Sequence, residues 1–112
     1  MEKIRRQYRI NQDQYGDILI SLTEAVNNAI IHGNRRDRRK TVSIKLLQLG
    51  NGLAFQVSDQ GRGFDHHRLP DPTNPENLLK AGGRGVFLMQ QLSDKIRFTD
   101  EGRTVEMQFK LR

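Results

Sequence analysis

A carboxylate and a carboxamide lie one helical turn apart in the first third of the sequence. Glu24 and Asn28 are four residues apart, so on a helix they share a face, with Ile31 or His32 at the next step. An amide oxygen suits the oxygen shell of Mg²⁺, and a neighbouring carboxylate can orient or deprotonate a nucleophile. The same spacing is also typical of an ordinary solvent-facing stripe. A lone histidine near a helix end is usually a capping or packing residue.

A second segment places a carboxylate before two glycines. Asp59 ends a run of alternating apolar residues, and Gly61 and Gly63 follow it. Glycines let a ligand approach the backbone closely, and a fixed carboxylate suits the exocyclic amine of a nucleotide base. By itself this pattern also occurs in ordinary turns.

A third segment leads from glycines into an apolar helix pattern. Gly82, Gly83 and Gly85 precede Val86, and a helix N-terminus offers free N–H groups to a phosphate. The segment lacks the Gly-Lys-Ser/Thr ending of a P-loop and the spacing of a dinucleotide fingerprint. Taken alone, it is also typical of a flexible hinge.

Regular elements must position these segments. Helical periodicity runs from about Gln14 to Ile31, and Gly33-Asn34 predicts a C-terminal cap. Alternating apolar residues predict two hairpins, one on each side of a long proline- and glycine-rich stretch, 60–83, which is typical of a functional or mobile loop. A second long helix follows that stretch. We therefore predict an α+β, two-layer sandwich, with a mostly antiparallel sheet and helices on one face.

Composition excludes several classes of protein. The 112 residues contain no cysteine, which excludes disulfide scaffolds, thiol catalysis and cysteine-ligated metals. Neither an apolar run long enough to span a membrane nor a secretory signal is present, so we expect a cytoplasmic protein. The net charge is +6, and five of the six residues at 35–40 are basic. That run is either a solvated loop or a contact for an anionic partner or a nucleotide phosphate. Neither interleaved aromatics nor zinc-finger spacing supports direct nucleic-acid binding.

In their order and spacing, the three segments resemble the GHKL (Bergerat-fold) ATPase superfamily, with its N box and two glycine boxes. Within it, the chain is most similar to the anti-sigma-factor serine kinases, over about residues 15–112. The matching motifs are Glu24-Ala25-x-x-Asn28-Ala29-Ile30-Ile31-His32-Gly33, Asp59-Gln60-Gly61-x-Gly63-Phe64, Gly82-Gly83-x-Gly85-Val86-Phe87-Leu88 and the closing Gly102-Arg103-Thr104-Val105.

This resemblance implies a role for each matching residue. It implies ATP and Mg²⁺ as cofactors, with Glu24 as the catalytic general base and Asn28 as the Mg²⁺ ligand. Asp59 would accept from the adenine amino group, with Thr104 nearby on the adjoining strand. The glycines implied to shape the adenine pocket and the phosphate lid are Gly61, Gly63, Gly83 and Gly85.

The expected function is that of an anti-sigma factor and ATP-dependent serine protein kinase, which sequesters a sigma factor and phosphorylates an anti-anti-sigma protein. One alternative is a nucleotide-gated binding switch without useful kinase turnover, which the presence of Glu24 disfavours. Another is a detached histidine-kinase-like ATPase domain, which the lack of a histidine-bearing helix pair disfavours. We expect one ATP-binding domain over 1–112 that contacts neither nucleic acid nor membrane directly. Only about a dozen residues precede the first long helix, so the family's N-terminal strand and part of its first helix are expected to be missing, which leaves a homodimer open.

Overall fold

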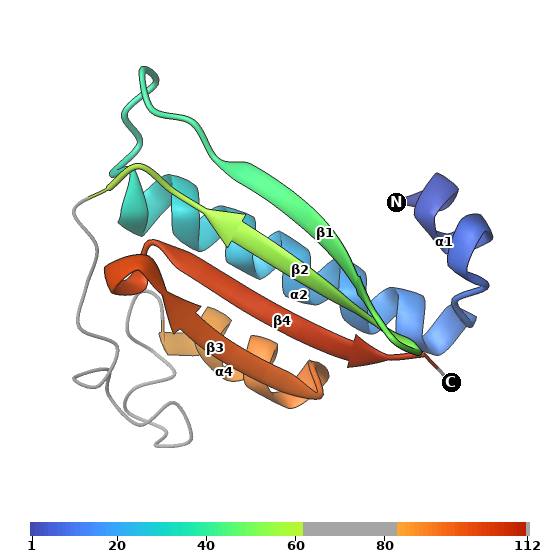
Figure 1. Cartoon of the computed structure of the whole chain (residues 1–112). Coiled ribbons are helices and arrows are strands. Elements are labelled where there is room, and N and C mark those ends of the chain that lie inside the picture. The colour runs from blue at the N-terminus through green and yellow to red at the C-terminus, as the bar shows by residue number, and fades with distance from the viewer. Residues whose placement is uncertain (62–82, 112) are drawn as a thin grey trace.

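The computed structural model describes residues 1–61 and 83–111. Gly63 and most of the predicted loop at 60–83 lie outside the described residues. Figure 1 shows the elements along the chain. In order, they are α1 (Glu2–Tyr8), α2 (Gln12–Asn28), the π-helical turn η1 (Ala29–Gly33), β1 (Ser43–Leu49), β2 (Gly52–Ser58), α4 (Gly83–Leu92), β3 (Lys95–Thr99), the 3₁₀ turn η3 (Asp100–Gly102) and β4 (Thr104–Lys110).

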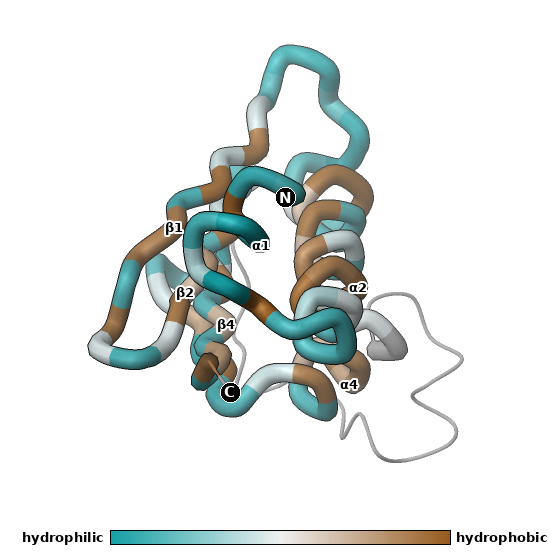
Figure 2. The backbone as a smooth tube through the Cα atoms, turned by 90° about the vertical axis from the view of Figure 1, so that its right-hand side faces the viewer, coloured by the Kyte–Doolittle hydropathy of each residue, from teal (hydrophilic) through white to brown (hydrophobic). Residues whose placement is uncertain are grey.

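The strands form one antiparallel sheet in the order β1-β2-β4-β3. Helices α2 and α4 pack against each other and cover one face of the sheet, which Figure 2 shows from the side. The predicted α+β sandwich is confirmed. Strands β1 and β2 are joined by the two residues Gly50 and Asn51, and Gly50 has a φ of 54°, which L side chains rarely adopt.

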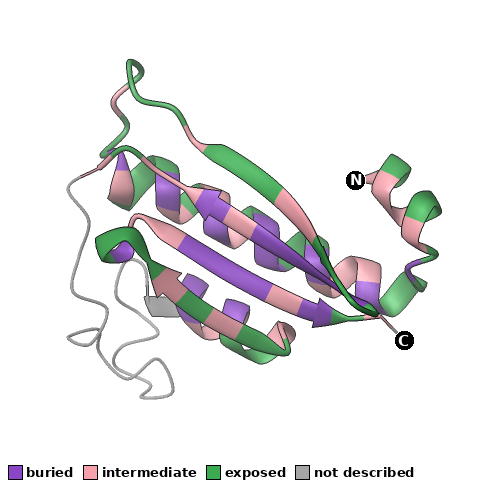
Figure 3. Ribbon diagram, viewed as in Figure 1, coloured by how far each residue is buried: buried purple, intermediate pink, exposed green. Residues whose placement is uncertain are grey.

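The core lies between the sheet and the two long helices. Residues on the central strands β2 and β4 are mostly buried, whereas the outer strands β1 and β3 are more exposed (Figure 3). The rings of Phe55 and Phe109 meet edge to face, with centroids 6.1 Å apart. Ile18 from α2 and Met89 from α4 close the other side. Burial of each such side chain contributes about 1.5–3 kcal/mol, so the helices are held firmly on the sheet.

Helix α2 begins at a side-chain cap. The Asn11 carboxamide oxygen accepts from the backbone N–H of Gln14 at 2.8 Å, which satisfies one of the free donors of the first turn. The short helix α1 precedes this cap, and its Arg5 guanidinium lies over the ring of Tyr15, 5.0 Å from the centroid. Within residues 1–61 and 83–111, every helix is too short or too polar for a membrane span.

The end of α2 differs from the prediction. The helix widens into η1, where the N–H of Asn34 donates to Ala29 O, five residues back, at 2.8 Å. Neither Gly33 nor Asn34 takes the left-handed conformation of a glycine cap. The left-handed residues are Arg35 and Arg36, with φ of 51° and 59°. The helix therefore stops where predicted, but the predicted capping mechanism is wrong, because the wide turn delays the reversal of the chain by two residues.

Candidate nucleotide site

Gly85 brings the start of α4 against Glu24 and Asn28 of α2. A Cβ atom added to Gly85 would lie 2.9 Å from Asn28 Nδ2 and 3.1 Å from Glu24 Oε2. Both separations are shorter than ordinary van der Waals contact, so any side chain at position 85 would require the Asn28 and Glu24 side chains to shift. Glu24 and Asn28 are half-buried. Within the described part of the chain, their side chains make neither a hydrogen bond nor an ion pair. Their oxygen atoms therefore remain available at the N-terminal end of α4, which begins at Gly83.

The predicted extension of this polar stripe to Ile31 or His32 stays a prediction. Both residues are exposed, and they lie in the π-helical turn that follows Asn28. A π turn holds more residues than an α turn, so the spacing from Asn28 to Ile31 or His32 is no longer that of an α-helix. Only Glu24 and Asn28, which precede the turn, keep the predicted α-helical relationship.

Asp59 lies at the other end of the site, packed between Gly33 and Gly61. A Cβ on Gly33 would lie 2.3 Å from the Asp59 Cγ, and a Cβ on Gly61 would lie 2.0 Å from the Gly33 carbonyl oxygen. The N–H of Gly61 donates to Asp59 Oδ1 at 2.8 Å. Gly33 is thus needed for close packing against the carboxylate and not for a helix cap. The last residue of η1, Gly33, and the residues that follow β2 therefore pack closely around this carboxylate.

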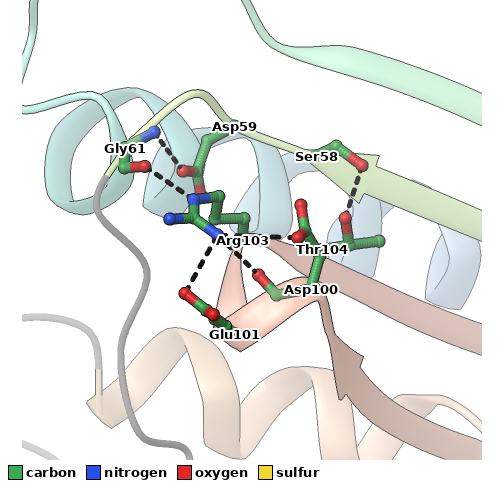
Figure 4. A network of polar contacts seen from close by, with 7 residues as sticks. All are labelled: Ser58, Asp59, Gly61, Asp100, Glu101, Arg103 and Thr104. Atoms are coloured by element: carbon green, nitrogen blue, oxygen red, sulfur yellow. Dashed lines mark hydrogen bonds and ion pairs between the residues drawn. The ribbon is translucent and has the colours of Figure 1, made fainter.

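Thr104 is next to this region in the sheet, but its side chain is not brought to Asp59. Thr104 pairs with Ser58, and their hydroxyl oxygens are 2.7 Å apart (Figure 4). Successive side chains in a strand alternate between faces, and Val105 belongs to the core on the helix side. The Thr104 hydroxyl therefore lies on the opposite face of the sheet, bonded to Ser58.

Arg103 makes the contact with the Asp59 segment from this side, and the sequence analysis did not single it out. Its backbone oxygen accepts from the N–H of Asp59 at 2.9 Å, and its Nε donates to the carbonyl oxygen of Gly61 at 2.8 Å. Figure 4 shows the guanidinium group reaching from the β3–β4 turn to Gly61. The only sequence signal was its position between Gly102 and the predicted site residue Thr104.

Two further residues missed by the sequence analysis tie the Asp59 segment to the loop after α2. The buried Asn34 carboxamide accepts from the N–H of Gln60 at 2.7 Å and donates to the carbonyl of Thr41 at 3.0 Å. The Gln60 side chain accepts from the N–H of Thr41 at 2.9 Å. These three bonds close a ring. Asp59 is therefore flanked on both sides by residues that are fixed to other elements.

The basic run at 35–40 is ordered on the surface between η1 and β1. Arg39 donates to the Asp37 carboxylate through Nε and a terminal nitrogen at 3.1 Å each, which holds the pKa of Asp37 below its usual value. The other cations of the run are exposed, and in the described part of the chain their side chains make neither hydrogen bonds nor ion pairs. These are Arg35, Arg36, Arg38 and Lys40. A solvated loop and an anionic contact both remain compatible with this geometry.

The donor set at Glu24 and Asn28 fits Mg²⁺ better than a metal held wholly by protein. In the described ranges, no group of three His, Cys, Asp or Glu residues could hold a metal ion. Glu24 and Asn28 offer one carboxylate and one amide oxygen. Mg²⁺ commonly takes one or two protein oxygens and completes its coordination shell with water and substrate phosphates. Glu24 and Asn28 match that coordination pattern.

Comparison with known proteins places this chain in a family. Residues 1–109 match the model of the histidine kinase-like ATPase domain. The chain is 35% identical over 102 residues to the serine-protein kinase RsbW of Bacillus licheniformis, and 31% identical over 102 residues to that of Bacillus subtilis. Each alignment covers 85% of this chain and 64% of the relative. Serine-protein kinase RsbW of Listeria monocytogenes is 28% identical over 98 residues, which cover 81% of this chain and 62% of the relative.

The chain thus spans a little less than two thirds of the length of the curated relatives that it matches. The matched region includes both ends of the candidate site, from Glu24 to Arg103. This result confirms the ATPase superfamily predicted from the three segments. The chain belongs to the histidine kinase-like ATPase domain family.

Proposed function

We propose that this chain is the ATP-binding domain of a serine protein kinase that also acts as an anti-sigma factor. The observation that carries the proposal is the contact of Gly85 with Glu24 and Asn28, since it gathers a base, an oxygen ligand and a helix N-terminus at one point. Phosphoryl transfer needs mainly such positioning and charge neutralisation. The similarity to serine-protein kinase RsbW supports the same reading.

In this proposal, Glu24 is the general base. Its carboxylate takes the proton from a serine hydroxyl of the substrate protein. The serine oxygen forms a bond to the γ-phosphorus of ATP, and the bond from that phosphorus to the bridging oxygen of ADP breaks. The products are phosphoserine and ADP. The free N–H groups at the start of α4 (Gly83–Leu92) seat the phosphates.

Asn28 is the proposed protein ligand of Mg²⁺, through its amide oxygen, with Glu24 beside it. When bound, Mg²⁺ supplies charge neutralisation at the phosphate oxygens. This assignment is supported by the fit of the two side chains to an oxygen-loving ion, described above.

Asp59 is the proposed acceptor for the adenine amino group. Its Oδ1 already accepts from Gly61, and a carboxylate has capacity for further donors. The close packing of Gly33 and Gly61 around the carboxylate supports this role, because it leaves the group fixed in one orientation. Gly61 and Gly63 are proposed to shape the pocket wall around the base, and Gly83 and Gly85 to form the phosphate side.

The proposed partners are a sigma factor, which the protein sequesters, and an anti-anti-sigma protein, which it phosphorylates. The proposed setting is the cytoplasm, in which both partners would be found. Residues 1–112 are proposed to form one ATP-binding domain.

The first test is calorimetric titration of the purified chain with ATP and Mg²⁺, with GTP and duplex DNA as controls. We expect saturable binding of ATP that strengthens with Mg²⁺, and weaker binding of GTP. Equal affinity for ATP and GTP would contradict the adenine pocket, and a folded chain that does not bind ATP would refute the function altogether. Transfer of labelled γ-phosphate to a serine of a candidate anti-anti-sigma protein then separates a kinase from a binding switch.

A further inference from the structure

We propose that Arg103 is a positioning residue of the nucleotide site, which fixes the Asp59–Gly61 segment in the geometry that receives the adenine base. This assignment rests on the proposed function, because it concerns the same pocket. It goes beyond it by giving a role to an arginine at the end of the β3–β4 turn, where neither the motifs nor the family match assigns one.

Arg103 holds the segment at two points, one on each side of the Asp59 carboxylate. Its backbone oxygen accepts from the N–H of Asp59 at 2.9 Å, and its Nε donates to the Gly61 carbonyl at 2.8 Å. Between these two bonds, Gly61 N–H donates to Asp59 Oδ1 at 2.8 Å. A displacement of Gly61 would therefore turn the carboxylate, so the position of Arg103 sets the direction in which Asp59 faces a ligand.

The guanidinium group of Arg103 also contacts the turn between β3 and β4. Its terminal nitrogen lies 3.3 Å from the Asp100 carbonyl oxygen and 3.3 Å from a Glu101 carboxylate oxygen. Figure 4 shows the guanidinium group beside Asp100 and Glu101. Asp100 and Glu101 both have left-handed backbone conformations, with φ of 52° and 56°, which curl the turn around the arginine. The Arg103 side chain is only 28% exposed. The turn, the arginine and Gly61 thus form a continuous support from β4 to the end of β2.

Only an arginine can make this support. Its planar fork presents several N–H donors in fixed directions, so one side chain can donate to Gly61 and to the turn at the same time. A lysine would keep the positive charge beside Asp100 and Glu101, but its single ammonium group cannot reproduce the fork. Since Arg103 contacts Gly61, whereas Glu24 and Asn28 contact Gly85, its effect belongs to the base end of the site.

The test compares the binding of ATP and adenosine by calorimetry in wild type, Arg103→Met and Arg103→Lys. Loss of a hydrogen bond from a charged group predicts that Arg103→Met raises the Kd by about tenfold. We expect the same factor for both ligands, because the base alone uses the supported segment. Arg103→Lys should lie between Arg103→Met and wild type. In a kinase assay, the KM for ATP should rise with kcat unchanged, a split that a general loss of structure would not produce.

Arg97→Met is the matched control, since Arg97 also pairs through its Nε, at 3.1 Å from Glu106, but in β3 and away from Gly61. It should bind both ligands as wild type does. Wild-type affinity in Arg103→Met would overturn the assignment, as would a loss confined to ATP, which would indicate a phosphate contact. Should Arg103→Met not fold, Arg103→Lys decides by the same criteria. A wild-type chain that binds neither ligand would overturn the proposed function, and this assignment with it.

Discussion

The two ends of the candidate site differ in how their polar groups are satisfied. Around Asp59, the protein itself supplies hydrogen bonds to the carboxylate, to Gly61 and to Gln60. At the other end, the Glu24 and Asn28 side chains pack closely against Gly85. Within residues 1–61 and 83–111, these two side chains make no hydrogen bond to the protein. Networks in a low-dielectric setting are costly to rearrange. In the proposed function, the Asp59 end would therefore recognise the nucleotide without moving, and the Glu24 and Asn28 side chains would remain available for the nucleotide and the reaction.

The largest effect on phosphotransfer should come from a substitution at the Glu24–Asn28 end of the site. Glu24→Gln removes the proposed base but keeps the size of the side chain, so phosphotransfer should fall by about 10²–10⁴-fold. ATP affinity should stay close to that of wild type. Steady-state kinase assays and calorimetry measure the two quantities. Asn27→Ala, at an exposed neighbouring position of α2, is the control and should keep full activity; a Glu24→Gln enzyme as fast as wild type would remove Glu24 from catalysis.

At the recognition end, Gly61→Ala should disrupt the packing that fixes Asp59. The new Cβ would meet the Gly33 carbonyl oxygen at 2.0 Å, and a backbone atom cannot turn aside as a side chain can. Overpacking of this kind costs about 1–3 kcal/mol, to be measured by urea denaturation, and ATP affinity should fall as well. Gly16→Ala is the control: nothing lies within 4 Å of its Cβ position, and alanine in a helix should stabilise the protein by about 1 kcal/mol. Equal stability of the two variants would show that Gly61 does not pack tightly against Gly33 beside Asp59.

Asp59→Asn tests recognition without a steric clash. The substitution replaces one acceptor oxygen by an amide donor, which cannot accept from the adenine amino group. ATP binding should weaken by about 1–3 kcal/mol, which is about 5- to 150-fold in Kd. The kcat should change much less than in Glu24→Gln. Calorimetry that gave the wild-type affinity would place Asp59 outside the pocket.

The smallest effect on the nucleotide should come from the opposite face of the sheet. Glu106 is only 4% exposed. Hydrogen bonds from Gln56 and Gln108 at 2.8 Å each, with Arg97 nearby, hold its pKa below the usual value. A lowered pKa in the folded state adds stability above the pKa of the unfolded chain, and that stability is lost as the pH falls through the folded value. Glu106→Gln should therefore lower the free energy of unfolding by about 1–3 kcal/mol at pH 7, and the difference from wild type should shrink below about pH 4.

The affinity for ATP should be unchanged in Glu106→Gln. Urea denaturation at several pH values, together with calorimetry, checks both statements. A change in ATP affinity would mean that the two faces of the sheet are coupled. A stability difference independent of pH would mean that the charge of Glu106 does not contribute.

The elements could be predicted because their signals are local. The alternation in Leu53, Phe55 and Val57 and the helical periodicity around Ile18 and Leu22 each depend on a few neighbouring residues, and the structure confirms them. Gly33 shows the limit of such reasoning. Its place at the end of a helix suggested a cap, but the reason for a glycine is Asp59, which lies 26 positions further along the chain.

Arg103 was missed for a related reason. Its direction is set by a turn in which Asp100, Glu101 and Gly102 all have positive φ, and glutamate is a residue type that rarely takes this conformation. The side chain then reaches Gly61, which is far away in sequence. Thr104 was within reach of sequence reasoning, since the alternation of Val105 and Met107 already implies that it faces away from the helices.

The π-helical turn between Asn28 and Asn34 has a consequence for how the sequence can diverge. One residue corresponds to about 100° of rotation on a helix. A single deletion or insertion between Asn28 and Gly33 would therefore turn Gly33 away from Asp59 while Glu24 and Asn28 stayed in place. Changes of length should be excluded from this stretch. The neighbouring loop at 35–40 is exposed and closed off by the Asn34–Thr41 bond, so it can absorb such changes without disturbing either end of the site.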